Sequence, residues 1–138
     1  RPSTPLRSLH GPERRFNSNE PMHFVIPGQL PDLNYIIALS KRHWGGYAAE
    51  KRRHTRRVAL LARAAGLHPM EHPVTVKFTW VCKNRRKDKD NVRFADKFIL
   101  DGLVEAGILP NDGWSHILEL EDHFDIDQQH LRIEVELV

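Results

Sequence analysis

The sequence predicts an α+β fold in which helices pack on a mixed β-sheet. Residues 74–82 alternate between apolar and polar side chains, as in a half-buried strand. Residues 91–106 instead repeat their apolar side chains every three or four positions, which is typical of an amphipathic helix. Together with the order strand, two helices, strand, helix, strand, strand, these two patterns favour one sheet covered by helices.

The other elements follow from local signals. Residues 22–27 form a short apolar run that ends at Pro27-Gly28, which predicts a first strand. Asp32 is the expected cap of the next helix, and Gly45-Gly46 separates it from a second helix over 47–65. Gly107 is the expected stop of the helix over 91–106. Two last strands are expected near 115–124 and 130–138.

Length and composition limit the class of protein. The chain has 138 residues, enough for one domain with a core of its own, and 40% are hydrophobic. We expect residues 1–20, rich in Arg, Pro and Ser, to be a flexible basic tail. No run of 18 apolar residues predicts a membrane span. The single cysteine, Cys82, rules out an internal disulfide, so a cytoplasmic location is expected.

The net charge of +3 hides an uneven distribution along the chain. Residues 1–66 carry 12 Lys and Arg against 4 Asp and Glu, whereas residues 67–138 carry 9 against 14. Such a division predicts a basic surface that attracts a polyanion, next to acidic residues with a different role.

Two aspartates stand where the strand over 74–82 gives way to the helix that follows. On extended backbone, Asp88 and Asp90 would project from the same side and hold one divalent cation. Asp112, in the loop after the helix, joins them if the chain folds back. Three carboxylates without a soft ligand favour Mg²⁺ or Mn²⁺ over zinc or copper.

A structural role fits the same aspartates equally well. Asp and Asn are common helix N-caps, and Asp112-Gly113 is an ordinary turn. A calcium loop starting at Asp88 is a poor match, because its sixth residue is Arg93 instead of glycine and its twelfth is Ile99 instead of glutamate.

Lys97 lies seven residues after Asp90, two turns along the same face of a regular helix. Helical side chains lean towards the N-terminus, which would bring its ammonium group towards the carboxylates. The alternative is an exposed lysine whose stem covers the apolar stripe.

Two clusters of cations predict a surface for nucleic-acid phosphates. Each also fits a merely solvated face, but cations around an acidic metal site are more specific. The first cluster lies in the second helix and the other flanks the aspartates. The members are Lys51, Arg52, Arg53, Arg56 and Arg57, and Arg85, Arg86, Lys87, Lys89 and Arg93.

The run KDKDNVRFADKFILDGLVEAGILPNDGW, residues 87–114, resembles the RusA family of Holliday junction resolvases, especially its phage and prophage branch. The resemblance extends over residues 22–138 and includes FVIPG at 24–28. It implies a RusA-like single domain over 21–138. It also implies that Asp88, Asp90 and Asp112 are metal-binding catalytic acids and that Lys97 is the catalytic lysine. Compared with compact bacterial members of the family, about three extra residues lie between Asn91 and Lys97. Arg93 could therefore take the role of the catalytic lysine in place of Lys97.

The resemblance further implies a Mg²⁺-dependent endonuclease that resolves four-way DNA junctions as a homodimer, in recombination and repair. If the gene is phage-borne, the host cytoplasm is the expected location. The residues alone support a metal-dependent phosphodiesterase on a basic surface. Two alternatives stay open: a non-catalytic protein that binds branched DNA, and a metal-dependent nuclease for flaps, forks or RNA.

Overall fold

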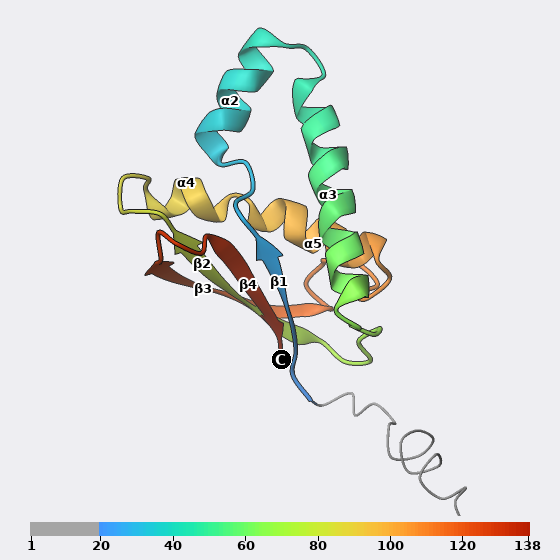
Figure 1. The fold of residues 1–138 in the computed structure, drawn as a ribbon. Helices are drawn as coiled ribbons and strands as arrows, with labels where there is room; N and C mark the ends of the chain where they lie inside the picture. The colour runs from blue at the N-terminus through green and yellow to red at the C-terminus, as the bar shows by residue number, and fades with distance from the viewer. Residues whose placement is uncertain (1–19) are drawn as a thin grey trace, which may run out of the picture.

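The central layer of the protein is a four-stranded mixed sheet, seen in a computed structural model that describes residues 20–138 (Figure 1). Its strands are β1 (Met22–Pro27), β2 (Val74–Cys82), β3 (Ile117–Ile126) and β4 (Arg132–Leu137). In the sheet order β1-β4-β2-β3, β4 is antiparallel to both neighbours, and β2 and β3 are parallel. The predicted α+β fold is confirmed. The tail predicted over 1–20 lies outside the described residues, apart from Glu20.

The helices are α2 (Leu33–Arg42), α3 (Gly46–Ala64), α4 (Lys89–Arg93) and α5 (Asp96–Glu105). In Figure 1, α2 and the first half of α3 rise above the sheet as a hairpin, and α5 lies between α3 and the sheet. The core between these layers contains Phe78, Trp80, Phe98, Ile99 and Leu103. Within residues 20–138, no helix is long and apolar enough to cross a membrane.

Most predicted boundaries agree with the structure. The strands over 22–27 and 74–82 are confirmed, and the two last strands lie about two residues from their expected positions. Asp32 caps α2 as expected, because its Oδ1 accepts a hydrogen bond from the backbone N–H of Tyr35 at 2.8 Å. Gly107 follows the last helix with φ +79°, a conformation that glycine adopts without strain.

The single helix expected over 91–106 is wrong, because α4 and α5 are separated at Phe94 and Ala95. The chain tightens there: the backbone N–H groups of Ala95, Lys97 and Phe98 each bond to the carbonyl three residues earlier. This turn sets the rings of Phe94 and Phe98 edge to face, with centroids 6.0 Å apart. It also changes the angular relation between Asp90 and Lys97 that a regular helix would give.

The middle of α3 is less exposed than its run of cations suggested. Consecutive charged residues favour exposure on all sides of a helix, but His54 and Thr55 are buried where α3 packs on α5. The His54 ring lies 5.7 Å from that of Phe98, and burial lowers the pKa of this histidine.

The contact between α3 and α5 depends on Gly102. A Cβ atom at this position would lie 2.6 Å from Cβ of Val58 and 3.0 Å from the carbonyl oxygen of Thr55. The glycine of the DGL sequence therefore lets two helices approach closely.

Gly102→Ala should reduce the free energy of unfolding by about 1–2 kcal/mol. Overpacking against Val58 costs about 1–3 kcal/mol and outweighs the roughly 1 kcal/mol that alanine gains in helix propensity. Urea denaturation measures the difference. Glu105→Ala, at an exposed position of the same helix, is the control and should change stability by less than about 0.5 kcal/mol. Equal or greater stability of Gly102→Ala would contradict the packing argument.

The parallel pairing of β2 and β3 determines where the loops lie. Val74 pairs with Ile117 at one end of the two strands and Cys82 with Ile126 at the other. The loop over 83–88 therefore leaves one end of the sheet, whereas the loop over 110–116 meets the opposite end, where the backbone N–H of Val74 bonds to the carbonyl of His116.

Candidate functional site

Asp88 and Asp90 lie at the N-terminus of α4, at the end of the exposed loop that follows β2. Asp88 holds the N-cap position in an extended conformation, but its side chain makes no capping hydrogen bond. Asp90 lies in the first helical turn. The extended backbone predicted for both aspartates is therefore found only at Asp88. Among the described residues, neither carboxylate has a hydrogen-bond or ion-pair partner. Both remain available to a cation.

Asn91, the next residue, fixes this end of α4. It is buried, and its side-chain oxygen accepts a hydrogen bond from the backbone N–H of Asn34 at 2.8 Å. Lys87 makes a second link, because its Nζ lies 2.7 Å from Oδ2 of Asp32. The candidate site is thus attached on both sides to the start of α2.

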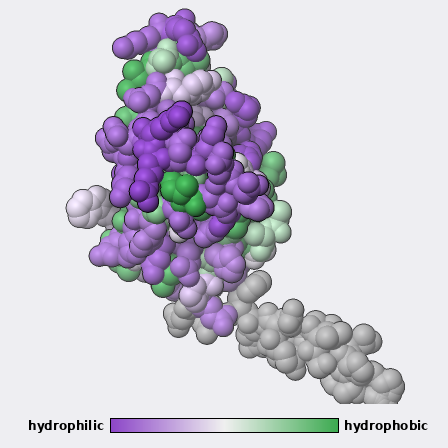
Figure 2. Space-filling view, turned by 60° about the vertical axis from the view of Figure 1, so that its left-hand side comes forward, coloured by the Kyte–Doolittle hydropathy of each residue, from purple (hydrophilic) through white to green (hydrophobic). Residues whose placement is uncertain are grey.

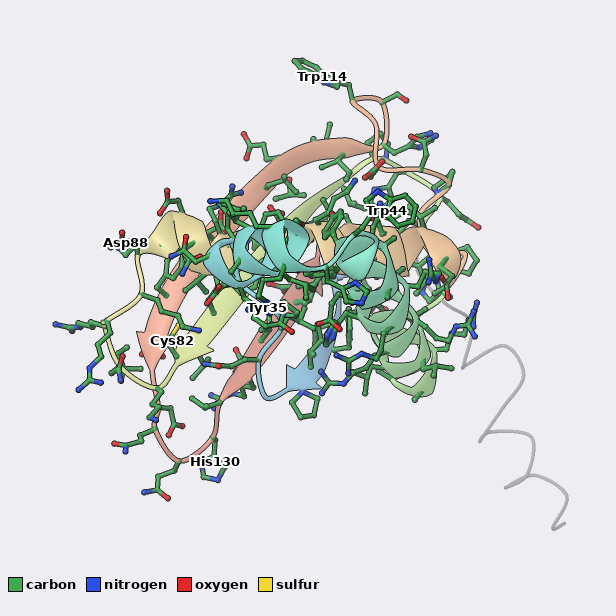
Figure 3. All side chains as sticks on the ribbon, turned by 90° about the horizontal axis from the view of Figure 1, so that it is seen from above. Tyr35, Trp44, Cys82, Asp88, Trp114 and His130 are labelled. Carbon is green, nitrogen blue, oxygen red and sulfur yellow. The ribbon has the colours of Figure 1, made fainter. Side chains whose placement is uncertain are left out.

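Asp112 does not lie beside Asp88 and Asp90 within one chain. Its loop meets the start of β2, whereas Asp88 follows the end of this nine-residue strand. The strand separates its ends by roughly 26 Å at about 3.3 Å per residue. Figure 3 accordingly shows Asp88 and Trp114, two residues beyond Asp112, far apart, at the left and at the top of the view. The turn there is closed by Asn111, whose Oδ1 accepts from the Gly113 N–H at 2.8 Å.

The arrangement of the acidic side chains reflects the same separation. Residues 20–138 contain no group of three or more His, Cys, Asp or Glu side chains that could hold a metal ion. The structure thus brings Asp88 and Asp90 to one helix end and leaves Asp112 at the other end of the sheet.

Lys97 is directed to a different carboxylate. Its Nζ lies 3.5 Å from Oδ1 of Asp101, one turn further along α5. Lys51 of α3 lies on the other side of Asp101, 3.3 Å from Oδ2, an ion-pair distance without the alignment of a hydrogen bond. The Lys51–Asp101 pair therefore joins α3 and α5, and Lys97 is partnered within α5 before any ligand arrives.

The cations of the 83–89 segment surround the aspartates at the surface. Arg85 and Arg86 are exposed, and their guanidinium groups have no partner in the part of the chain that the structure describes. Lys89 lies with its Nζ 5.3 Å from the centre of the Phe124 ring. Seen from this side, the surface is mostly hydrophilic, with a small apolar patch at the centre of the view and further apolar atoms towards its edges (Figure 2).

The cations of α3 are exposed or half-buried, and most of them are paired. Arg53 bonds to Glu50 at 2.9 Å, Arg56 lies 3.9 Å from Glu105, and Arg57 donates to the carbonyl of Pro27. Arg52 is exposed without such a partner among residues 20–138. Exposed ion pairs contribute little to stability and exchange readily, so these side chains can still turn to phosphates.

Arg93 belongs to a half-buried cluster that sequence analysis missed. Its Nε donates to Oδ2 of Asp122 at 2.7 Å, and its Nη2 donates to Asp96 at 3.2 Å. The indole N–H of buried Trp80 donates to Oδ1 of Asp122 at 2.7 Å. The cluster ties α4 and α5 to β2 and β3, and Arg93 is committed to it.

One sequence signal could have revealed this cluster. On β3, the residues that pair with the core-facing positions of β2 include Leu120, Asp122, Phe124 and Ile126. A carboxylate in an otherwise apolar period-two pattern needs a buried partner. The partner of Asp122 could not be found among its neighbours in the sequence, because Arg93 lies on α4.

Burial raises the pKa of Asp96 to about 6, while the Arg93 guanidinium acts in the opposite direction. The folded state thus binds a proton at Asp96 more tightly than the unfolded state does, so its stability falls as the pH rises from about 4 to about 6.

Asp96→Asn should therefore stabilise the protein at neutral pH. A pKa raised to about 6 corresponds to at most about 3 kcal/mol, and partial exposure reduces the expected gain to about 1–2 kcal/mol. Thermal unfolding at about pH 7.5 should show this gain, which should vanish near pH 4. Asp125→Asn, on the exposed face of β3, is the control. An Asp96→Asn effect that is equal at both pH values would contradict the assignment.

Comparison with known proteins gives no further assignment: no protein-family model matches the chain, and no curated protein matches its sequence. Function is therefore inferred from the geometry of the described residues and from the resemblance of residues 87–114. That geometry offers two free carboxylates among exposed cations, a combination suited to a divalent cation and a phosphate ester.

Proposed function

We propose that the protein is a Mg²⁺-dependent nuclease that cleaves branched DNA, and that it is a RusA-like resolvase of four-way junctions. The observation that carries the proposal is the pair of unpartnered carboxylates, Asp88 and Asp90, next to the free cations Arg85 and Arg86. The choice of a four-way junction as substrate comes from the resemblance of residues 87–114 to that family.

The residues present suit Mg²⁺ better than a softer metal. Mg²⁺ is commonly held by one or two carboxylates, several waters and the phosphates of the substrate, and does not need a complete protein cage. Asp88 and Asp90 would hold it, and Mn²⁺ would substitute. When bound, the metal would polarise the phosphate and lower the pKa of a water molecule.

The remaining cations would bind the DNA backbone. Arg85, Arg86 and Lys89 flank the carboxylates directly, whereas the α3 residues extend the basic surface along the helical hairpin. Lys97 would reach a phosphate only by leaving Asp101, so its proposed catalytic role requires a rearrangement at the start of α5. Arg93 is a poorer choice, since Asp122 and Asp96 already hold it.

Asp112 would complete the site only from a second copy of the chain. Within one chain it lies at the far end of the sheet from Asp88, and side-chain reach does not bridge that separation. The proposed homodimer then has a chemical reason, because each site would combine Asp88 and Asp90 of one copy with Asp112 of the other.

Mixed dimers test this arrangement. Asp90→Asn and Asp112→Asn should each abolish cleavage, whereas an equal mixture, after subunit exchange, should recover about a quarter of the wild-type sites, since only heterodimers contain one intact site. The product should be a single nick instead of paired cuts. Full cleavage by Asp112→Asn alone would remove Asp112 from the site.

A substrate panel tests the proposed function as a whole. Labelled four-way junction, fork, flap, duplex, single strand and RNA are incubated with protein in Mg²⁺, in Mn²⁺ and in EDTA. We expect metal-dependent paired nicks in the junction. Preferential cleavage of flaps, forks or RNA would support the proposed nuclease activity but contradict the four-way junction as its substrate.

A second candidate function is binding of branched DNA without cleavage. The observation that favours it is the lack of any group of three metal-binding side chains in the described chain. Under this reading, Asp88 and Asp90 repel phosphates and set the position of the DNA. Salt-sensitive junction binding with no nicking in Mg²⁺ or Mn²⁺ would support it.

A further inference from the structure

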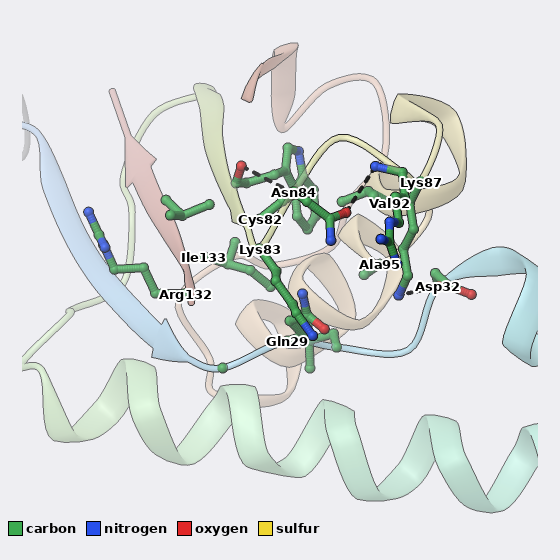
Figure 4. A pocket seen from close by; sticks show the side chains of 15 residues that line it. Gln29, Asp32, Cys82, Lys83, Asn84, Lys87, Val92, Ala95, Arg132 and Ile133 are labelled. Carbon is green, nitrogen blue, oxygen red and sulfur yellow. Dashed lines mark hydrogen bonds and ion pairs between the residues drawn. The ribbon is translucent and has the colours of Figure 1, made fainter. Parts of the chain in front are cut away.

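A cavity of about 290 Å³ lies next to the candidate site, between the end of β2, the segment before α2, and α4 (Figure 4). Its inner wall is apolar and includes Trp80, Val81, Ala95 and Ile133, all of them buried. Sequence analysis did not anticipate it, because its walls come from four separate segments of the chain. A volume near the lower end of the roughly 300–1,000 Å³ typical of small-molecule sites limits the occupant to a group of nucleoside size.

The mouth of the cavity carries positive charge. Lys83 and Arg86 are exposed on its rim, and their side chains have no partner among residues 20–138. The third rim cation, Lys87, is neutralised by Asp32, and Arg132 is held by Glu134 and Asp127. The free charge at the mouth is therefore that of Lys83 and Arg86.

The rim also offers amide groups for hydrogen bonding. The side-chain oxygen of Asn84 accepts from the backbone N–H of Arg86 at 3.0 Å, which fixes the loop and leaves the Asn84 NH₂ group to donate. Gln29 lies across the mouth on the segment before α2 (Figure 4). Amides of this kind pair with the polar edges of bases.

We propose that this cavity binds the base of one unpaired nucleotide, and that Lys83 and Arg86 hold the phosphate of the same nucleotide. An apolar wall suits the face of a base, amides suit its edge, and two cations suit the phosphate. The same loop leads directly into Asp88, so a strand anchored here would continue past the two carboxylates. That last step rests on the proposed function, whereas binding of the nucleotide itself does not.

Cys82 provides a direct readout, because its thiol lines the cavity and it is the only cysteine of the chain. The full-length protein in EDTA is alkylated with iodoacetamide and followed by intact mass. Burial raises the pKa of the Cys82 thiol, so the reaction is run at alkaline pH. Deoxynucleoside 5′-monophosphates should slow alkylation, deoxynucleosides should do so more weakly, and inorganic phosphate should not.

Arg86→Ala and Arg85→Ala form a matched pair of variants. Arg86 lines this cavity, whereas Arg85 lines a neighbouring cavity that Cys82 also borders. Arg86→Ala should weaken protection by the nucleotide about fivefold, and Arg85→Ala, whose side chain lies outside this cavity, should weaken it clearly less. Equal effects of the two variants would indicate general attraction and overturn the assignment.

DNA arms distinguish a free nucleotide from one in a strand. A single-stranded oligonucleotide and a four-way junction should protect Cys82, and a blunt duplex should not. If free nucleotides protect Cys82 but no DNA does, the cavity is a nucleotide site, and the proposal that an unpaired base of DNA occupies it is overturned. Protection by phosphate alone, or by none of the probes, would overturn the proposal. Because EDTA prevents cleavage throughout, a failure of the proposed nuclease activity leaves these results unaffected.

Discussion

Asp90→Asn is expected to abolish Mg²⁺-dependent cleavage of a four-way junction while leaving binding of the junction nearly unchanged. The substitution keeps the size of the side chain and removes the charge that attracts the cation. Asp90 is exposed and has no hydrogen-bond or ion-pair partner among the described residues, so neither folding nor the position of α4 should suffer. Loss of one metal ligand from a pair leaves too little charge to hold Mg²⁺ against water.

Three measurements make this result specific. Cleavage of labelled junction gives the activity, electrophoretic mobility shift in EDTA gives the affinity for DNA, and thermal unfolding gives the stability. Asp125→Asn is a matched control, being another exposed aspartate at the same end of the sheet. A variant Asp90→Asn that still cuts at nearly the wild-type rate in Mg²⁺ would refute the proposed metal site.

Asp122→Ala is expected to lower the free energy of unfolding by about 3 kcal/mol, the largest effect on stability that we predict. The carboxylate satisfies two donors at once, the indole N–H of Trp80 and the Nε of Arg93, each at 2.7 Å. Its removal leaves a buried N–H without an acceptor and a half-buried guanidinium with only Asp96. Both are costly in a site that water reaches poorly.

Glu119→Ala on the same strand is the control, since Glu119 is exposed and the structure assigns it no partner within residues 20–138. Its effect should be within about 0.5 kcal/mol. Urea denaturation followed by fluorescence suits both variants, because Trp80 reports on the cluster directly. If the two variants destabilise equally, the cluster contributes no more than an ordinary surface residue.

The local elements were predictable because their signals are local. The alternation over 74–82, the cap at Asp32 and the glycine after the last helix each act within a few residues, and all agree with the structure. The break at Phe94 and Ala95 was not predictable from periodicity, because the apolar stripe continues across it. The bond of Arg93 to Asp122 on β3 helps to fix that geometry, and Asp122 is 29 residues away in the sequence.

The candidate site was predictable only in part for the same reason. Asp88 and Asp90 are neighbours in sequence, so their common position follows directly from it. The relation of Asp112 to them depends on the direction in which β3 pairs with β2, which a single sequence does not reveal. Likewise, the charge pattern identified the cations but not their partners, and Lys97, Lys87 and Arg93 are each held by an aspartate.

The position of β4 has a consequence for the order of events during synthesis. Met22 at the start of β1 pairs with Leu137 at the end of β4, and β2 pairs with the other edge of the same strand. Until residues 132–137 are made, β1 therefore has no strand partner and β2 can pair only with β3. The helices can form meanwhile from contacts nearby in sequence, but the sheet closes last. A nascent chain that stalls before residue 132 would expose unpaired backbone groups along β1 and β2, and these edges could pair with strands of other unfinished chains.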